Sequence, residues 1–250
     1  MNFNQQWEIL DLTQEMYEGM PLFGIHQPTF IMTNQTHEVS MKKTGSKTLG
    51  FYARNLLISE HAGTHTDAVV EYKPGGASIE DMPIDYYFGD AICVDVSHIR
   101  YPEYIEVEDL EEALGKTDLQ IKKGDIFMMY TGHFERTHPI FHSDDDTVDV
   151  LNYGGLDSKH TGLSYNAAKW LADQGVVNIG VDSPAIDLTP DDLDYSGHLV
   201  CGEYDITNTE NLCNLDKLVG KRFVYFGLPL KIRGGTGSPI RSLALLPKNK

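Results

Sequence analysis

The sequence NLLISEHAGTHTD, residues 55–67, sets an apolar run directly before two histidines and an aspartate. Side chains alternate along an extended chain, so an extended backbone directs His61, His65 and Asp67 to one side. Glu71 would join them if the chain remained extended. On a helix, in contrast, Asp67 would be turned about 200° away from His65. An extended segment is therefore the geometry that brings the three side chains to one point.

Two imidazoles and a carboxylate without a thiolate form a ligand set that suits Zn²⁺, Mn²⁺ or Fe²⁺. Three protein ligands leave a coordination position open, which is typical of catalytic rather than structural metal sites. Gly63 lacks a Cβ atom, so a substrate or a neighbouring strand can approach closely at this position. The alternative interpretation is a pair of histidines whose hydrogen bonds are satisfied in the core or at the surface.

Apolar runs rich in β-branched and aromatic residues recur along the rest of the chain, each bounded by Gly, Pro, Asp or Asn. Such runs predict strands, which we expect at 7–12, 55–59, 91–97, 125–131, 176–182 and 222–232. Because helical stretches lie between these runs, the sequence predicts an α/β layered domain. We expect mixed strand directions, because several connections are too short for parallel crossovers.

Three segments carry apolar residues at helical spacing. The first covers 107–115. The second covers 164–174, where Ser164 fits the N-cap and Gly175 fits the C′ position. A third helix is expected to follow Asn208, through Leu212 and Leu215 to Leu218.

Length and composition limit the classes of protein and function. With 250 residues, 41% of them hydrophobic and 23% charged, the chain is expected to form one large domain over residues 1–250. No segment approaches the roughly 20 apolar residues of a membrane-spanning helix, so we expect no membrane insertion. The formal net charge of −17 argues against binding to nucleic-acid phosphates.

The start of the sequence and its cysteines predict a cytoplasmic protein. Residues 1–13 show neither the basic segment nor the continuous apolar segment of a secretory signal. Cys93, Cys201 and Cys213 form no C-x-x-C pair, and their odd number does not suggest a disulfide framework. We expect them to be buried thiols.

The histidine-rich segment resembles the signature H-x-G-T-H-x-D-x-P-x-H of the cyclase or kynurenine formamidase-like metal hydrolases. Further similar segments follow in the order of that family over most of the chain, which is more specific than one short motif. They are Asp11-Leu12-Thr13, Gly19-Met20-Pro21-Leu22, Gly162-Leu163-Ser164, residues 180–187 (GVDSPAID), Gly197-His198-Leu199, Glu210-Asn211-Leu212, Asn214-Leu215, Leu228-Pro229-Leu230-Lys231-Ile232 and Gly237-Ser238-Pro239-Ile240-Arg241.

The resemblance implies a fold, a metal site and an activity. The fold would be an α/β single domain with mixed β-sheets that form a swivelling β/α/β barrel-like core, in a homo-oligomer, either a dimer or a tetramer. One or two divalent ions, Zn or Mn, would be held by His61, His65 and Asp67 and by a second group, His198 and Glu210, with Asp67 placed to bridge. The activity would be metal-assisted hydrolysis of an amide, formamide, lactam or lactone bond of a small-molecule substrate.

The chain departs from the signature at its end. Val69 stands where the family has proline, and Glu71 stands where it has a histidine that serves as general acid and base. A glutamate beside a metal-activated water can also carry a proton to the leaving group. Glu71 is therefore either the proton carrier or a structural carboxylate. Phe23 lies where the family often presents an aromatic ring to the substrate, sometimes from a neighbouring subunit, although core packing is the alternative.

Other polar groupings in the sequence favour simpler interpretations. Residues 132–160 are expected to form a long loop, on which His133, His138 and His142 are a rival ligand set but are expected to be exposed. The run Asp144 to Asp146 lacks the spacing of a calcium loop and is expected to be a solvated charge run. The glycines of 234–237 lack the Lys-Ser/Thr ending of a P-loop, so they predict a tight turn.

Three functions follow from the residues. The leading interpretation is a metal-dependent hydrolase in which the ion activates water and polarises a carbonyl while Glu71 moves the proton. The second is a metal-dependent lyase, cyclase or dehydratase at the same site, because an ion that stabilises an enolate also serves elimination. The third is a catalytically silent metal- or ligand-binding protein, suggested by the altered residue at position 71.

Overall fold

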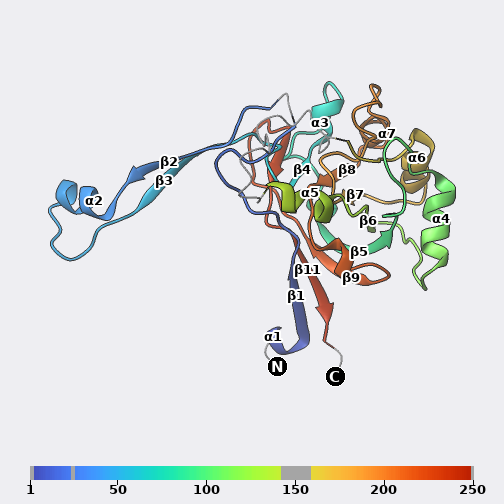
Figure 1. The fold of residues 1–250 in the computed structure, drawn as a ribbon, viewed down its shortest axis with the longest axis horizontal. Coiled ribbons are helices and arrows are strands. Elements are labelled where there is room, and N and C mark those ends of the chain that lie inside the picture. Colours follow the sequence, from blue (N-terminus) through green and yellow to red (C-terminus); the bar gives the residue numbers. More distant parts are fainter. Residues whose placement is uncertain (1–2, 24–25, 142–158, 249–250) are drawn as a thin grey trace.

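A nine-stranded sheet organises the protein in the computed structural model, which describes residues 3–23, 26–141 and 159–248 (Figure 1). Across the sheet the strands follow the order β1, β11, β9, β5, β6, β7, β8, β4, β10. Their bounds are β1 Trp7–Asp11, β4 His65–Asp67, β5 Phe88–Asp95, β6 Ile126–Tyr130, β7 Asn178–Val181, β8 Thr207–Glu210, β9 Arg222–Phe226, β10 Gly237–Pro239 and β11 Leu243–Pro247.

The strand directions are mixed, as the short connections predicted. Strands β5, β6, β7 and β8 are parallel, and the flanking strands β9, β11, β1, β4 and β10 are antiparallel to their neighbours. The parallel crossovers contain α4 (Val107–Gly115), α5 (His133–Phe141) with α6 (Tyr165–Asp173), and α7 (Ser196–Tyr204). The α/β class with a curled, barrel-like mixed sheet is therefore confirmed.

The central strands are covered on both faces. Ile92 and Val94 of β5 pack in one hydrophobic cluster with residues of α4, α6 and α7. Ala91 and Cys93, whose side chains point the opposite way, pack in a second cluster with Leu12 and the segment after β8. Burial on both faces explains why β5 and β6 read as apolar runs. The three cysteines are free and buried, as predicted.

Two of the three predicted helices are confirmed, with their caps. Helix α4 has the expected bounds. Helix α6 begins after Ser164, whose Oγ accepts a hydrogen bond from the backbone N of Ala167 at 3.2 Å. Gly175 follows that helix with a φ of 86°, a left-handed conformation in which a Cβ atom would be strained.

The third predicted helix is wrong. After Asn208 the chain continues as strand β8 and then forms only the short 3-10 helix η3 (Leu215–Lys217). Asn211 and Asn214 adopt positive φ angles of 54° and 59°, which interrupt a right-handed helix. The leucines that suggested helical spacing are all buried in the second cluster, so they reach the core without a continuous helix.

The predicted loop over 132–160 is also corrected in part, because its first residues form helix α5. Residues 142–158, which include His142 and Asp144 to Asp146, lie outside the described residues, and so does the side chain of His138. In the described part of the chain, no helix is long and apolar enough to cross a membrane.

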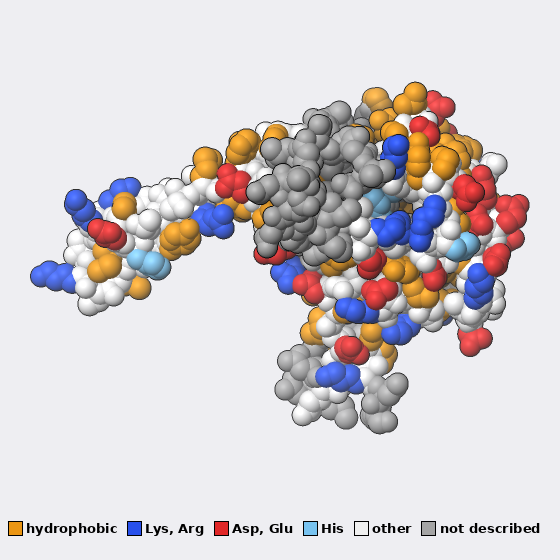
Figure 2. Space-filling view, viewed as in Figure 1, with side chains coloured by type: hydrophobic (Ala, Val, Ile, Leu, Met, Phe, Trp, Pro, Cys, Tyr) orange, Lys and Arg blue, Asp and Glu red, His pale blue; other side chains and the backbone are white. Residues whose placement is uncertain are grey.

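A second, two-stranded sheet extends from the body as an arm (Figure 1). The arm, residues 30–57, contains β2 (Phe30–Gln35), α2 (His37–Thr44) and β3 (Ala53–Leu57). Strands β2 and β3 pair with each other in antiparallel register. Figure 2 shows hydrophobic side chains along this arm and Lys and Arg side chains gathered towards its far end. The remaining short elements are α1 (Phe3–Gln6), α3 (Val69–Tyr72) and the 3-10 helix η1 (Ile84–Tyr86).

Candidate metal centre

The histidine-rich segment is extended only in its second half. His65 and Asp67 lie on β4, which is held between β8 and β10 and is fully buried. His61 lies in the preceding turn, where Gly63 has a φ of 63°. Glu71 lies on the short helix α3 and not on a continued strand. The four side chains still converge, but the turn and the helix replace the single extended segment that was predicted.

His198 and Glu210 reach the same place from the carboxyl-terminal part of the chain. Glu210 ends β8, directly opposite His65 of β4 in the strand register. His198 lies in the first turn of α7, and its Nδ1 contacts Oδ2 of Asp187. That contact turns Nε2 of His198 towards Asp67 and Glu210.

Four of these side chains form a closed ring of contacts. Nε2 of His65 lies 3.5 Å from Oδ1 of Asp67 and 3.5 Å from Oε2 of Glu210. Nε2 of His198 lies 3.4 Å from Oδ2 of Asp67 and 3.4 Å from Oε1 of Glu210. These separations exceed the usual hydrogen-bond range of about 2.7–3.2 Å. Two ligand atoms bound tetrahedrally at about 2.0–2.2 Å from one Zn²⁺ lie roughly 3.4 Å apart, so the ring fits an ion.

Two triads in this cluster meet the geometry of a cation site. Potential ligand atoms lie within 4.8 Å of one another in the triad His61, His65 and Asp67 and in the triad Asp67, His198 and Glu210. Asp67 belongs to both, and its two carboxylate oxygens face different imidazoles. The donor set therefore fits one divalent ion or two.

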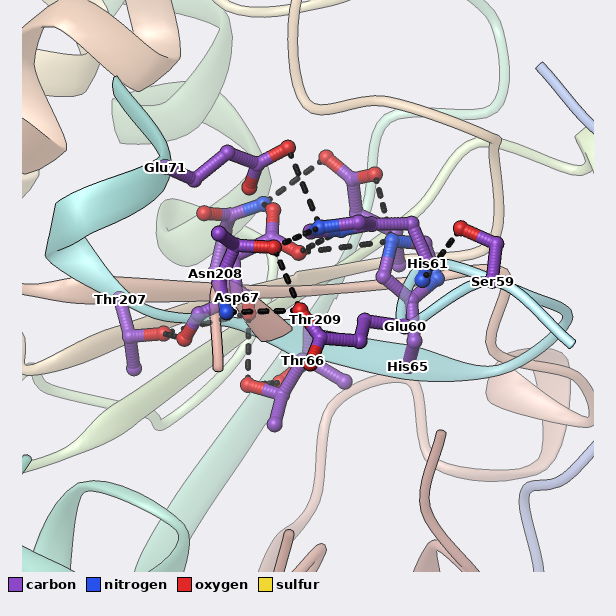
Figure 3. A network of polar contacts seen from close by, with 12 residues as sticks. Ser59, Glu60, His61, His65, Thr66, Asp67, Glu71, Thr207, Asn208 and Thr209 are labelled. Atoms are coloured by element: carbon purple, nitrogen blue, oxygen red, sulfur yellow. Dashed lines mark hydrogen bonds and ion pairs between the residues drawn. The ribbon is translucent and has the colours of Figure 1, made fainter. Parts of the chain in front are cut away.

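The contacts of His61 are shorter than the 3.4–3.5 Å contacts among His65, Asp67, His198 and Glu210 (Figure 3). Its Nδ1 is 2.8 Å from Oδ1 of Asp67, and its Nε2 is 2.9 Å from Oγ1 of Thr236. Thr236 in turn donates to Oε2 of Glu60 at 2.7 Å. Oε1 of Glu71 is 3.5 Å from Nε2 of His61, so Glu71 lies beside the triad.

The three imidazoles differ in pKa because their surroundings differ. Burial lowers the pKa of His65 to about 4, which keeps it in the neutral form that binds metals. Burial also acts against the charged forms of His61 and His198, but neighbouring carboxylates outweigh it and raise both pKa values. The carboxylate is Asp67 for His61, and chiefly Asp187 for His198.

The carboxylates are crowded. Burial and the charge of Asp67 raise the pKa of Glu210 well above its usual range and that of Glu71 to about 10. Burial alone would also raise the pKa of Asp67, but His61 and His198 hold it well below its usual value. Several buried carboxylates can all be ionised together only when a cation beside them compensates their charge. Together with the distances of the ring, this crowding indicates that the residues fit a divalent ion.

The cluster forms one wall of a cavity of about 420 Å³. Other walls are apolar or aromatic and include Phe23 and Tyr72, with Asp194 among the polar residues. The cavity therefore brings together all seven side chains that the sequence singled out: Phe23, His61, His65, Asp67, Glu71, His198 and Glu210.

Three further residues at the site were missed by the sequence interpretation. Asn208 donates through Nδ2 to Oδ2 of Asp67 at 2.6 Å and to Oε1 of Glu210 at 2.9 Å, while its own Oδ1 is buried without a partner. Its position two residues before Glu210 on a strand was the available signal. Asp187 orients His198, and no sequence pattern marks that contact. His26 stacks on His61 with ring centroids 5.1 Å apart, a contact that also has no local signature.

Of the rival ligand set, only the side chain of His133 lies within the part of the chain that the structure describes. His133 is buried rather than exposed, which corrects the prediction, and its ring lies 5.4 Å from that of His160. Gly234 has a φ of 68°, as expected of a tight turn, and its backbone N donates to Glu80.

The chain is similar to known proteins over most of its length. The sequence model of the cyclase family, described as putative cyclase, matches residues 10–188. A kynurenine formamidase from Salinibacter ruber is 30% identical over 196 residues, which cover 76% of this chain and 77% of that protein. An isatin hydrolase from Roseibium aggregatum is 26% identical over 254 residues, which cover 96% of this chain and 92% of the relative.

Solved structures show the same fold. Isatin hydrolase A from Labrenzia aggregata, bound to benzyl benzoate, matches with a TM-score of 0.80 at 21% identity, over 98% of this chain and 96% of that one. The fold and site thus define an α/β protein with a buried cluster of histidines and carboxylates suited to a divalent cation. The chain belongs to the cyclase family, which confirms the resemblance seen in its sequence.

Proposed function

We propose that this protein is a metal-dependent hydrolase that cleaves an amide, formamide, lactam or lactone bond of a small molecule. The observation that carries the proposal is the ring of contacts at 3.4–3.5 Å among His65, Asp67, His198 and Glu210. The ring faces a cavity large enough for a small organic molecule. The names of the relatives, kynurenine formamidase and isatin hydrolase, support the same class of reaction.

In this proposal the cation, Zn²⁺ or Mn²⁺, would be held by His61, His65 and Asp67 and by His198 and Glu210, since Asp67 belongs to both triads. A bound ion of this kind lowers the pKa of a coordinated water towards about 7 and polarises a carbonyl. Asn208 fixes the carboxylates of Asp67 and Glu210, because its Nδ2 donates to both. The Asp187 carboxylate fixes the ring of His198 by accepting a hydrogen bond from its Nδ1.

Glu71 is the proposed proton carrier. It lines the cavity beside His61, and its side chain keeps 28% exposure, so it can reach a substrate in the cavity. Burial and the charge of Asp67 raise the pKa of Glu71, and a cation beside Asp67 would offset that charge, so Glu71 could then take a proton at its carboxylate and return it to the leaving group. Phe23 is the proposed substrate-binding residue, because an aromatic ring on the cavity wall offers an apolar face to a planar substrate.

The first test is elemental analysis of protein purified without chelator. We expect about one or two equivalents of Zn or Mn per chain, because two triads share Asp67. Protein that retains no metal, even after incubation with each ion, contradicts the proposal.

The metal-loaded protein is then assayed on formanilides, lactams, lactones and simple amides in water labelled with ¹⁸O. Label in the carboxylate product supports hydrolysis. Turnover without label favours a lyase, cyclase or dehydratase at the same site, and tight binding without turnover favours a silent binding protein. We propose a cytoplasmic homo-oligomer, a dimer or a tetramer, as the state to assay.

A further inference from the structure

The cavity beside the candidate metal centre is acidic. Among the described residues that line it, none is Lys or Arg, and the carboxylates are those of Asp67, Glu71, Asp194 and Glu210. The two internal segments outside the described residues, 24–25 and 142–158, contain no Lys or Arg in their sequences. A substrate that carries a carboxylate would therefore meet no Lys or Arg of the described lining with which to form an ion pair.

The N-terminus of α7, which borders this cavity, does not supply an anion site either. The backbone N of Ser196 donates to Oδ2 of Asp192 at 3.0 Å. The next two backbone N atoms, those of Gly197 and His198, both donate to Oδ1 of Asp187, at 2.6 Å and 3.2 Å. Free N–H groups attract an anion to a helix N-terminus, and here carboxylates of the chain already occupy them.

Asp194 differs from the other three carboxylates of the cavity. Asp67 and Glu210 belong to the ring of contacts, and Glu71 lies beside the first triad. The Asp194 carboxylate makes no hydrogen bond or ion pair within the described part of the chain. The backbone N of Asp194 donates to Oδ1 of the buried Asp192 at 3.1 Å, which anchors the turn. An anchored turn therefore holds an unpaired negative charge at the cavity wall.

Aromatic rings line the same cavity. Tyr195 is the next residue in the chain, and its ring centroid lies 6.4 Å from that of His198. Tyr195 has a φ of 50°, which is uncommon for a residue other than glycine, and hydrogen bonds to Asp192 on either side of it hold that conformation. Phe23 and Tyr72 add two further rings. Because the face of an aromatic ring attracts a cation, a carboxylate next to such rings suits an ammonium group.

We propose that the substrate is a small molecule that carries an ammonium group in addition to the bond that is cleaved, and that Asp194 selects it. This inference rests on the hydrolase function proposed above and names its substrate class. The carbonyl would lie at the metal centre, while the ammonium group would pair with Asp194 beside the ring of Tyr195. Water adds to the carbonyl carbon, the bond to the leaving group breaks, the leaving group takes up a proton, and the ammonium group stays unchanged.

The charge of the cavity decides between this substrate class and two others. A divalent ion would offset the charges of Asp67 and Glu210, but Asp194 belongs to neither triad of candidate ligands. An anionic substrate would be repelled by Asp194, and a neutral substrate would leave its carboxylate without a partner. Holding the metal ion therefore does not account for Asp194, whereas an ammonium group on the substrate does.

Formanilides that differ only in the para substituent test the inference on the metal-loaded full chain. The substituents are aminomethyl, which is cationic at neutral pH, hydroxymethyl and carboxylate, and we expect kcat/KM to fall in that order. Asp194→Asn should lower the ratio of kcat/KM for the aminomethyl compound to that for the hydroxymethyl compound about fivefold, the size of one partly exposed ion pair. Asp194→Lys should reverse the preference in favour of the carboxylate compound.

Asp191→Asn is the matched control. That carboxylate accepts a hydrogen bond from the hydroxyl of Tyr101 at 2.8 Å and is not among the residues that line the cavity. The ratio should therefore stay the same in Asp191→Asn. Circular dichroism and elemental analysis check that each variant folds and holds its metal.

Binding of benzyltrimethylammonium separates the inference from the proposed hydrolysis. Its fixed charge cannot coordinate a metal, so its Kd, measured by isothermal titration calorimetry beside that of benzyl alcohol, reports recognition of the cation without turnover. We expect benzyltrimethylammonium to bind the metal-loaded protein more tightly than benzyl alcohol, and about fivefold more weakly in Asp194→Asn. Such binding without turnover of any formanilide would contradict the hydrolase function and leave the cation site standing.

Three results overturn the inference. The first is a wild-type protein that prefers benzyl alcohol to benzyltrimethylammonium or binds neither. The second is a change of less than twofold in both the ratio and the Kd in Asp194→Asn, or an equal change in Asp191→Asn. The third is a loss of metal as the only effect of Asp194→Asn, which would make Asp194 part of the path or site of the metal ion.

Discussion

The candidate metal centre and the arm are built in opposite ways. The centre gathers side chains from a turn, two strands and two helices that are far apart in the sequence, and its metal-binding candidates are almost fully buried. The arm is made of neighbours in sequence, and most of its side chains are exposed. Burial fixes the positions and protonation of charged groups in the centre, whereas the side chains of the arm remain in contact with solvent.

A histidine from each region gives the largest contrast. His65→Ala should remove the metal and lower kcat/KM about 10³-fold or more, because the ion supplies several kcal/mol. His37→Ala, a matched substitution in the exposed arm, should leave both unchanged. Metal content by elemental analysis and turnover on whichever amide the screen identifies measure the difference. Equal losses in the two variants would break the distinction between centre and arm.

A glutamate pair separates proton transfer from metal binding. Glu71→Gln should lower kcat roughly 10²-fold with metal content retained, because the amide keeps the shape of the side chain but cannot carry the proton. Glu38→Gln on the arm is the control, since its side chain is exposed and far along the chain from the cavity. Full activity in Glu71→Gln would leave that residue a structural carboxylate.

Asp187 tests how far the centre depends on residues that do not face the cavity. Asp187→Asn keeps an oxygen for the backbone N of Gly197 but presents an amide to Nδ1 of His198. The imidazole then favours a proton on Nε2, the nitrogen that faces Asp67 and Glu210. Metal affinity should fall about 10- to 100-fold. A competition titration with a chromogenic chelator measures this, and an unchanged affinity would show that the orienting contact is dispensable.

The smallest expected effect is on stability at acid pH. His160 is buried, and burial lowers its pKa to about 4 from an unfolded value near 6.5. Between these two pH values the unfolded chain therefore binds more protons at His160 than the folded chain does. The contribution of neutral His160 to the free energy of unfolding is present above about pH 6.5 and is lost as the pH falls towards 4. The slope from this group is at most about 1.4 kcal/mol per pH unit.

Urea unfolding at several pH values measures that slope, and His160→Gln should reduce it. His37→Gln in the arm should not change it, because that side chain is exposed. The same slope in the wild type and in His160→Gln would exclude His160 as its source.

The sequence by itself determined the features that depend on local pattern. Apolar runs identified β5, β6, β7 and β9, and the caps at Ser164 and Gly175 identified α6, because burial and capping act over a few neighbouring residues. The spacing of His61, His65 and Asp67 identified the first triad, because it is set within seven residues.

Only the tertiary structure decided how distant segments meet. The chain at Asn208 is extended as part of β8, because it pairs there with β4 and β7. The expected helix is replaced by this strand and by the short 3-10 helix η3. Glu71 arrives by a helix, and Asp187 and His26 gain their roles from contacts that no local pattern records. The spacing of residues specifies which secondary structures a segment can form by itself. Long-range packing then selects one of these structures and brings distant side chains together.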